Sequence, residues 1–188
     1  YKGSSCPNAL GHELPLYGFV QETHFSDLLE RKIYTYNCIS ACIAYLGYEK
    51  GYTDYAEAAN DIEITEKIKR IAEVINRCIT TVYNVSMQEQ TAFSEMAIRK
   101  FQNRNIKDTV ARNVRDVERK LKPEERIRKP LSLMQEQGEY SRELLEVLAA
   151  ALRYGMKTKE LSQDWDKLVD FYTQGMCEEW KQVLHRCK

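Results

Sequence analysis

Three polar residues at fixed spacing offer the clearest chemistry in this chain: Lys32, Asn37 and Ser40. A lysine whose pKa is lowered by desolvation or by nearby cations can act as a general base. An asparagine amide N–H can donate to an oxygen on which negative charge develops. On a regular α-helix Lys32 and Ser40 lie about 80° apart, with Asn37 about 60° further round. We therefore expect the three side chains to converge on one sector of a helix.

These residues belong to an apolar segment, in which residues 33–46 carry no charge. Its apolar side chains surround most of the helix circumference, which is typical of a buried helix. The segment is too short for a membrane span, which needs about 20 apolar residues. We predict a buried central helix over about residues 27–46, ended by Gly47. Lys32 lies at the edge of this helix, where partial desolvation would suit a base. Composition alone favours a solvated lysine in the first helical turn, and only the resemblance described below reverses that preference.

The rest of the chain repeats apolar residues at helical spacing, and no alternating strand pattern of useful length appears. Asp54 and Glu57 form a plausible capping box, Asp108 is an acceptable N-cap, and Pro123 suits a first helical position. Gly155 is expected to stop a helix that begins near Ser141. Helices are predicted around residues 54–60, 64–82, 88–102, 141–153, 165–172 and 180–184, and after residues 108 and 123.

The predicted fold is all-α, with about eight or nine helices packed around the central one. Residues 1–25 hold three of the eight glycines and two of the four prolines, so we expect an irregular lead-in or interdomain connection there. Residues 26–188 are expected to form a single helical domain. No GxGxxG follows a strand, so the chain is predicted to lack a Rossmann cofactor domain.

Composition is ordinary for a water-soluble globular protein, with 30% charged residues, 43% hydrophobic residues and a formal net charge of zero. No signal peptide or long apolar run appears, so we predict a cytoplasmic location and no membrane partner. The six cysteines form no CxxC pair and are expected to be reduced. No cluster of ligands suggests a metal site.

A basic block covers residues 99–129, with twelve Lys or Arg against five Asp or Glu. Such a block can bind phosphate or nucleic acid, but more often it is a solvated face. Phe101 is its only aromatic residue, which argues against stacking on single strands. We therefore expect no nucleic-acid partner, although a basic helical nucleic-acid-binding domain remains an alternative.

Lys32-x4-Asn37-x2-Ser40 resembles the Lys-x4-Asn-x2-His signature of the polyol-specific long-chain dehydrogenases, which include mannitol and mannitol-1-phosphate dehydrogenases. A second block is similar to the family's Arg-Phe-x-Asn … Asp-Thr … Arg-Val-x-Arg-Asp … Arg-Lys-Leu run. Its members are Arg99 to Asn103, Asp108-Thr109, Arg112, Arg115-Asp116 and Arg119 to Leu121. The match lies within the family's C-terminal helical domain.

The resemblance implies roles for five residues. Lys32 would be the catalytic base and Asn37 the partner of the reacting oxygen, while Ser40, Arg112 and Lys120 would contact substrate. Ser40 departs from the family histidine; it can hydrogen-bond but does not titrate. His24, shortly before the helix, is a candidate replacement, although the favoured interpretation of this residue is a surface histidine in a loop.

The function implied by the resemblance is that of the substrate-binding and catalytic domain of an NAD(P)-dependent polyol or sugar-acid dehydrogenase. Its substrate would be a polyol, a sugar phosphate or a sugar acid. NAD or NADP would be bound mainly by an N-terminal Rossmann domain of the same protein, and this chain alone would be inactive. A non-catalytic helical module of the same descent, binding a sugar or phosphate, is the alternative that Ser40 favours.

Overall fold

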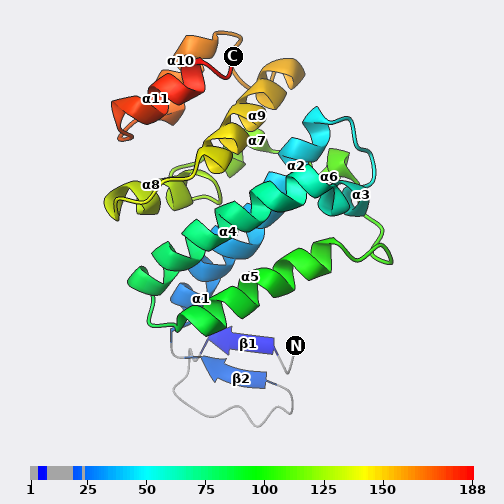
Figure 1. The fold of residues 1–188 in the computed structure, drawn as a ribbon, viewed down its shortest axis with the longest axis vertical. Helices are drawn as coiled ribbons and strands as arrows, with labels where there is room; N and C mark the ends of the chain where they lie inside the picture. Colours follow the sequence, from blue (N-terminus) through cyan, green and yellow to red (C-terminus); the bar gives the residue numbers. More distant parts are fainter. Residues whose placement is uncertain (1–3, 8–18, 23) are drawn as a thin grey trace.

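The computed structural model describes residues 4–7, 19–22 and 24–188, with side chains from residue 24 onward. The described part is mainly helical, as the periodicity predicts (Figure 1). Its helices are α1 Phe25–Lys32, α2 Cys38–Glu49, α3 Tyr55–Asn60, α4 Ile62–Val82, α5 Met87–Phe101, α6 Val110–Val114, α7 Val117–Lys120, α8 Arg128–Glu136, α9 Arg142–Thr158, α10 Trp165–Tyr172 and α11 Glu178–His185. A π-helical segment, η1 Ile33–Asn37, joins α1 to α2 without a break.

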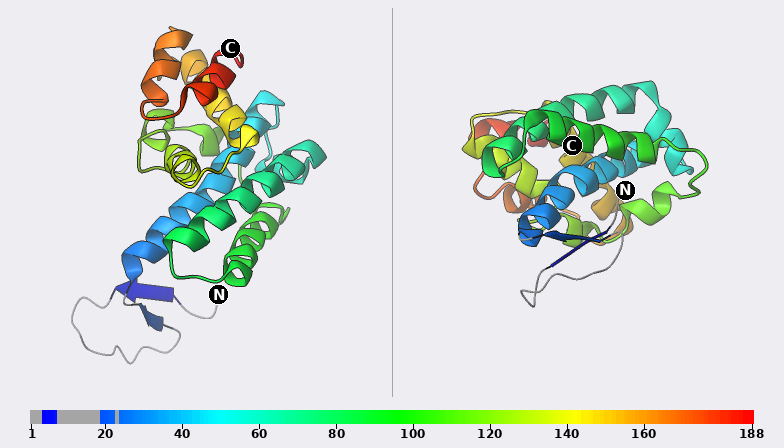
Figure 2. Two further views of the ribbon diagram at one scale, coloured as in Figure 1. Left: turned by 60° about the vertical axis from the view of Figure 1, so that its left-hand side comes forward. Right: turned by 90° about the horizontal axis from the view of Figure 1, so that it is seen from below.

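Two short strands precede the helices. β1 Ser4–Pro7 and β2 Phe19–Glu22 pair in parallel, with Ser4 opposite Phe19. The irregular lead-in predicted for residues 1–25 therefore contains a small sheet, and its other residues before His24 lie outside the described ones. The left view in Figure 2 agrees with Figure 1 in placing the strands beside α1, while α10 and α11 lie at the opposite end.

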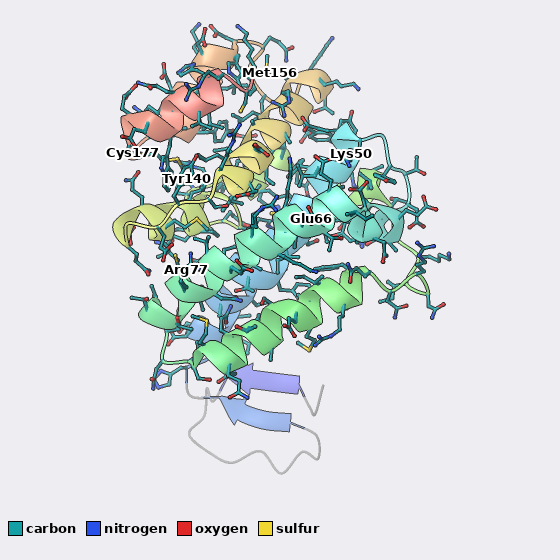
Figure 3. All side chains as sticks on the ribbon, viewed as in Figure 1. Lys50, Glu66, Arg77, Tyr140, Met156 and Cys177 are labelled. Carbon is teal, nitrogen blue, oxygen red and sulfur yellow. The ribbon has the colours of Figure 1, made fainter. Side chains whose placement is uncertain are left out.

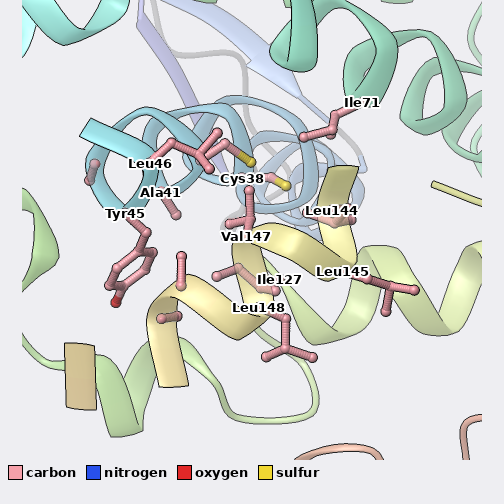
Figure 4. Close-up of a cluster of buried hydrophobic side chains, with 14 of the residues drawn as sticks. Cys38, Ala41, Tyr45, Leu46, Ile71, Ile127, Leu144, Leu145, Val147 and Leu148 are labelled. Atoms are coloured by element: carbon pink, nitrogen blue, oxygen red, sulfur yellow. The ribbon is translucent and has the colours of Figure 1, made fainter. Parts of the chain in front are cut away.

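The continuous helix α1–η1–α2 is the centre of the fold, and it runs somewhat further in both directions than predicted. Helix α2 packs against α3, α4, α5, α6 and α9. Figure 4 shows Cys38 of this helix next to Val147 of α9, while Leu145 and Leu148 of α9 point away from it. Because nearly every α2 side chain up to Gly47 is buried, the helix forms a core rather than a surface.

Helices α4 and α5 cover one side of the central helix. Helix α4 buries a stripe of residues spaced three or four apart, from Ile64 through Ile68 and Ile71 to Ile79, and this spacing is that of an amphipathic helix. Its outward face carries exposed charges, including Glu66 and Arg77 (Figure 3). The long helix expected over residues 64–82 is therefore confirmed.

Both glycines that we expected to end helices lie inside them instead. Helix α2 continues past Gly47 to Glu49, and α9 continues past Gly155 to Thr158. A Cβ on Gly47 would lie 2.7 Å from the Ala58 Cβ, and one on Gly155 would lie 2.5 Å from Leu161 Cγ. Each glycine therefore permits a close approach between elements rather than a turn.

The helix expected to open at Pro123 is also absent, since residues 121–127 form turns and α8 begins at Arg128. The short helix α7 was not predicted. Its N-cap residue, Asp116, has a positive φ of 60°, a conformation that aspartate tolerates better than most residues. The predicted Asp54 cap is confirmed, because its carboxylate accepts from the Glu57 N–H. Thr109, rather than Asp108, caps α6.

Asp61 provides a test of how the helices are capped. Its carboxylate accepts from the Ile64 N–H, from Lys50 and from Tyr52, and these bonds, the Ile64 bond foremost, lower its pKa to about 2. We expect Asp61→Ala to lower the free energy of unfolding by about 1 kcal/mol at neutral pH. Asp61→Asn should retain most of the cap.

The lowered pKa of Asp61 also predicts how this difference in stability changes with pH. A carboxylate whose pKa is lower in the folded state stabilises the fold above its unfolded pKa, about 3.9, and loses that contribution as pH falls through about 2. The difference in unfolding free energy between the native chain and Asp61→Ala should therefore shrink over this range. Urea denaturation at several pH values measures it, and a difference independent of pH would contradict the assignment.

Candidate active site

The π-helical segment changes the geometry of the Lys32, Asn37 and Ser40 motif. In such a segment the N–H of one residue donates to the carbonyl five residues earlier, and the Cys38 N–H donates to the Ile33 carbonyl. Lys32 is the N-cap and Asn37 the last residue of the segment, so Asn37 lies about one turn above Lys32. Ser40 follows three residues later, one α-helical turn further on. The three residues therefore share a face more closely than a regular helix would allow.

Their exposure differs along this face. Lys32 is exposed, while Asn37 and Ser40 are half-buried. The partial desolvation expected for Lys32 at the edge of the apolar helix is not observed, and the lysine is solvated because the segment before Ile33 lies at the end of the helical body. Within the described residues, this chain does not cover the Lys32 ammonium.

Ser40 opens into a cavity of about 280 Å³. The cavity is enclosed by the central helix, α3, the end of α5, the following loop and α6. Its lining residues are Tyr36, Ser40, Tyr55, Lys100, Phe101, Ile106, Asp108, Arg112 and Asn113. Of the predicted site residues, Ser40 and Arg112 are thus brought together, whereas Lys32 and Asn37 are not among those that line this cavity.

Tyr55 is a cavity residue that the sequence did not identify. Its hydroxyl lies 3.0 Å from Ser40 Oγ and donates to the Ser40 carbonyl at 2.9 Å. Burial raises the pKa of Tyr55 above its usual value, so this hydroxyl remains a neutral donor. The two hydroxyls form a polar pair on an otherwise aromatic wall, where Tyr55 and Tyr36 both contact Phe101.

Arg112 faces the cavity from α6, held by Asp108. Its Nε donates to Asp108 Oδ1 at 2.7 Å, and its Nη2 contacts the other carboxylate oxygen. The guanidinium lowers the pKa of Asp108 to about 2. Because the Arg112 side chain is 63% exposed, it can also reach a second anion in front of the cavity.

Lys120 is buried and lies behind the cavity wall. Its Nζ donates to the Asn113 carbonyl at 2.6 Å, and Asn113 itself lines the cavity. Burial, with the nearby charges of Arg126 and Arg119, lowers the pKa of Lys120 to about 8, while Asp116 and Glu160 oppose the shift. In this chain Lys120 therefore supports the backbone that carries the cavity.

The lowered pKa of Lys120 predicts a pH dependence of stability. Between pH 8 and 10.5 the unfolded chain binds more of this proton than the folded chain does, so the contribution of Lys120 to stability rises with pH over that window. The unfolding free energy of the native chain should rise relative to that of Lys120→Met. Urea denaturation of both proteins at matched pH values tests this, and a constant difference would contradict it.

Five of the twelve cations in the basic block of residues 99–129 form ion pairs with carboxylates among the described residues of this chain. Arg119 contacts Asp116 and Glu125, Arg126 contacts Glu125, and Lys129 contacts Glu124. These ion pairs, together with that of Arg112, spread the positive charge over several short elements. This arrangement differs from the continuous basic stripe that is typical of nucleic-acid binding.

Other features of the described residues lie away from this site. A hollow of about 420 Å³ between α4 and α5 includes none of the five predicted site residues. His24, the candidate replacement for the family histidine, lines another hollow with Arg31 and Tyr83.

Among the residues with described side chains, no group of three His, Cys, Asp or Glu is placed to hold a metal ion, and five cysteines are free thiols. No helix in the same part of the chain is long and apolar enough to cross a bilayer.

Comparison with known proteins identifies the relatives of this chain. Mannitol-1-phosphate 5-dehydrogenase of Enterococcus faecalis is 28% identical over 163 residues, covering 87% of this chain and 42% of the relative. That of Caldanaerobacter subterraneus subsp. tengcongensis is 32% identical over 150 residues, covering 80% and 39%. The chain thus spans about two fifths of the length of these relatives.

Solved structures share the fold. Pseudomonas fluorescens mannitol 2-dehydrogenase, in a ternary complex with NAD and D-mannitol, superposes with a TM-score of 0.72 at 17% identity, covering 90% of this chain and 39% of that one. A substrate-free D-sorbitol dehydrogenase gives a TM-score of 0.67 at 16% identity, covering 80% and 31%. The profile of the family described as "Mannitol dehydrogenase C-terminal domain" matches residues 24–185. The resemblance seen in the motifs is thereby confirmed: this chain belongs to the mannitol dehydrogenase C-terminal domain family.

Proposed function

We propose that this chain is the substrate-binding and catalytic half of an NAD(P)-dependent polyol dehydrogenase. The observation that carries the proposal is the π-helical segment, which aligns Lys32, Asn37 and Ser40 on a face that leads into the Ser40–Arg112 cavity. Family membership supports the same assignment. The reaction proposed is hydride transfer between the carbon of a secondary alcohol and a nicotinamide.

Each residue has a role that fits its position. Lys32 accepts the proton of the reacting hydroxyl as the C–H bond gives up its hydride, and Asn37 donates a hydrogen bond to the same oxygen. Ser40, fixed by the Tyr55 hydroxyl, and Arg112 bind the remaining oxygens of the substrate in the cavity. Lys120 acts indirectly: it donates a hydrogen bond to the carbonyl of Asn113, a residue that lines the cavity.

The nicotinamide cofactor would be held mainly by a separate domain. Over the described residues the chain offers helices and one pair of four-residue strands, with no βαβ unit to receive a dinucleotide. When bound, the nicotinamide accepts or returns the hydride. A cofactor domain docked over the exposed Lys32 would supply the desolvation that this chain does not.

The substrate proposed is a polyol or its phosphate, with a sugar acid as the third candidate. The curated relatives are named for mannitol 1-phosphate, and the solved neighbour was crystallised with D-mannitol. In the cavity, Arg112 offers a planar, always-charged fork, which suits a phosphate or carboxylate group. Its exposed position allows it to bridge Asp108 and such a group.

The test is NADH formation by the protein that carries this domain together with its cofactor domain. We expect activity with mannitol 1-phosphate or mannitol, and none with glycerol at the same concentration. No NADH formation with any polyol, polyol phosphate or sugar acid, in a protein that binds NAD, would contradict the proposal and favour a non-catalytic binding module.

The Tyr55–Ser40 pair gives a prediction about the cavity. Tyr55→Phe removes the hydroxyl that fixes Ser40 and should lower kcat/KM for the polyol about 5-fold, the value of roughly one hydrogen bond. Tyr52→Phe is the matched control, because its hydroxyl binds Asp61 outside the cavity, and it should leave kcat/KM unchanged. If the two variants had equal effects on kcat/KM, the cavity would not be part of the substrate site.

A further inference from the structure

A fully buried polar network lies directly beneath the π-helical segment. Gln90 of α5 is completely buried, and its side-chain carbonyl accepts from Arg31 Nε at 2.7 Å. The Gln90 amide donates to Thr35 Oγ1 at 2.9 Å and to Asn76 Oδ1 at 3.1 Å. One side chain thus joins α1, η1 and α4.

The two residues that Gln90 holds on the central helix lie on either side of Lys32. Arg31 immediately precedes Lys32, and Thr35 lies in the middle of the π-helical segment. Arg31 is itself buried, paired with Glu89 at 2.7 Å and stacked 4.9 Å from the Phe93 ring. Contacts from α5 therefore hold the central helix both just before Lys32, at Arg31, and just after it, at Thr35.

A π-helical turn needs such a constraint. It is a rare local conformation that holds one extra residue per turn, and it persists only where its surroundings favour it over the α-helix. Residues four apart share a face in an α-helix as well, but relaxing η1 to α-helical bonding would rotate Thr35 about the helix axis relative to Arg31. The Gln90 carbonyl and amide could then no longer keep their present bonds of 2.7 Å to Arg31 and 2.9 Å to Thr35. Because unpaired buried polar groups are costly, the network favours the π turn.

The network continues away from the segment and ends with its partners satisfied. The Asn76 amide donates to Ser94 Oγ at 3.0 Å, and Ser94 Oγ donates to the Thr91 carbonyl at 2.9 Å. The hydrogen bonds of Ser94 thus go to Asn76 and Thr91, not to the π-helical segment. It offers a control for any change made at Gln90.

We propose that Gln90 is a positioning residue, which holds η1 in π-helical geometry and thereby places Lys32 and Asn37 one turn apart on the substrate face. This role rests on the proposed function, because the face that carries Lys32 and Asn37 is the substrate face only if the chain is the catalytic domain of a polyol dehydrogenase. Gln90 does not touch the substrate. It acts through the backbone between Arg31 and Thr35.

The test measures the hydrogen bonds of the segment by NMR, through couplings across the bond between amide nitrogen and carbonyl carbon. In the native chain we expect the Cys38 amide to couple to the Ile33 carbonyl. In Gln90→Leu this coupling should be lost and replaced by one to the Tyr34 carbonyl, the α-helical partner. Ser94→Ala should keep the native coupling.

If Gln90→Leu does not fold, the same coupling is measured in Thr35→Val, which removes only the hydroxyl that Gln90 binds. An unchanged Cys38–Ile33 coupling in the folded variants would overturn the proposal, and so would the same loss in Ser94→Ala. The coupling is measured on this chain without cofactor or substrate, so its outcome is separate from that of the NADH assay. In the active enzyme, Gln90→Leu should lower kcat by up to about 100-fold with a smaller change in KM.

Discussion

Replacing Lys32 by methionine is expected to lower kcat for polyol oxidation by about 100- to 10,000-fold, the usual contribution of a positioned general base. The variant keeps the length and apolar stem of the side chain and removes the group that accepts the proton. Because Lys32 is exposed in this chain, the fold itself should be unaffected. The measurement is steady-state NADH formation by the protein that carries this domain with its cofactor domain.

Two further variants give this prediction its controls. Lys32→Arg keeps a positive charge but cannot act as a base near neutral pH, so it should be nearly as inactive. Lys122→Met removes an exposed lysine away from the cavity and should retain the native kcat. If Lys32→Met kept kcat within a few-fold of the native value, proton transfer would have to be assigned to another group.

The second large effect concerns the central helix. Ile43→Ala, in α2, is expected to lower the free energy of unfolding by about 2–5 kcal/mol, because it removes buried methyl groups and leaves a cavity. Ile43 is 1% exposed, whereas Ile62, at the start of α4, is 79% exposed. Ile62→Ala is therefore the matched control and should change stability by less than about 0.5 kcal/mol.

Urea denaturation of the two alanine variants compares the same chemical change at the centre and at the surface of the domain. Similar losses for Ile43→Ala and Ile62→Ala would contradict the view that the fold is organised around α2. A large loss for Ile43→Ala alone would support it.

The helical fold could be predicted because its signals are local. The burial of α2 follows from the uncharged run of residues 33–46, and the stripe from Ile64 to Ile79 specifies the inward face of α4. The family could be recognised because its lysine, asparagine and arginine motifs are short and fixed in spacing. These features need no knowledge of what each helix packs against.

What the sequence could not provide depends on tertiary contacts. Gly47 and Gly155 suggest helix ends, yet each is needed where a neighbouring residue approaches too closely for a Cβ. The proline at 123 suits a helix start, but the chain turns until Arg128.

The geometry of the motif was the most consequential difference. At α-helical spacing, Asn37 is expected about 140° from Lys32 around the helix axis. Nothing in the sequence of residues 33–37 signals the π turn that brings the two residues onto one face. The turn becomes understandable only with Gln90, more than fifty residues later, in contact with Thr35. Tyr55 was missed for the same reason, since its bond to Ser40 joins two different helices.

The most direct test of the central claim is a structure of the complete enzyme with a bound polyol. We predict the reacting hydroxyl within about 3 Å of both Lys32 Nζ and Asn37 Nδ2, the distance of a catalytic hydrogen bond. The rest of the polyol should extend toward Ser40 and Arg112. A polyol bound elsewhere, such as in the hollow between α4 and α5, with Lys32 facing solvent, would contradict the account.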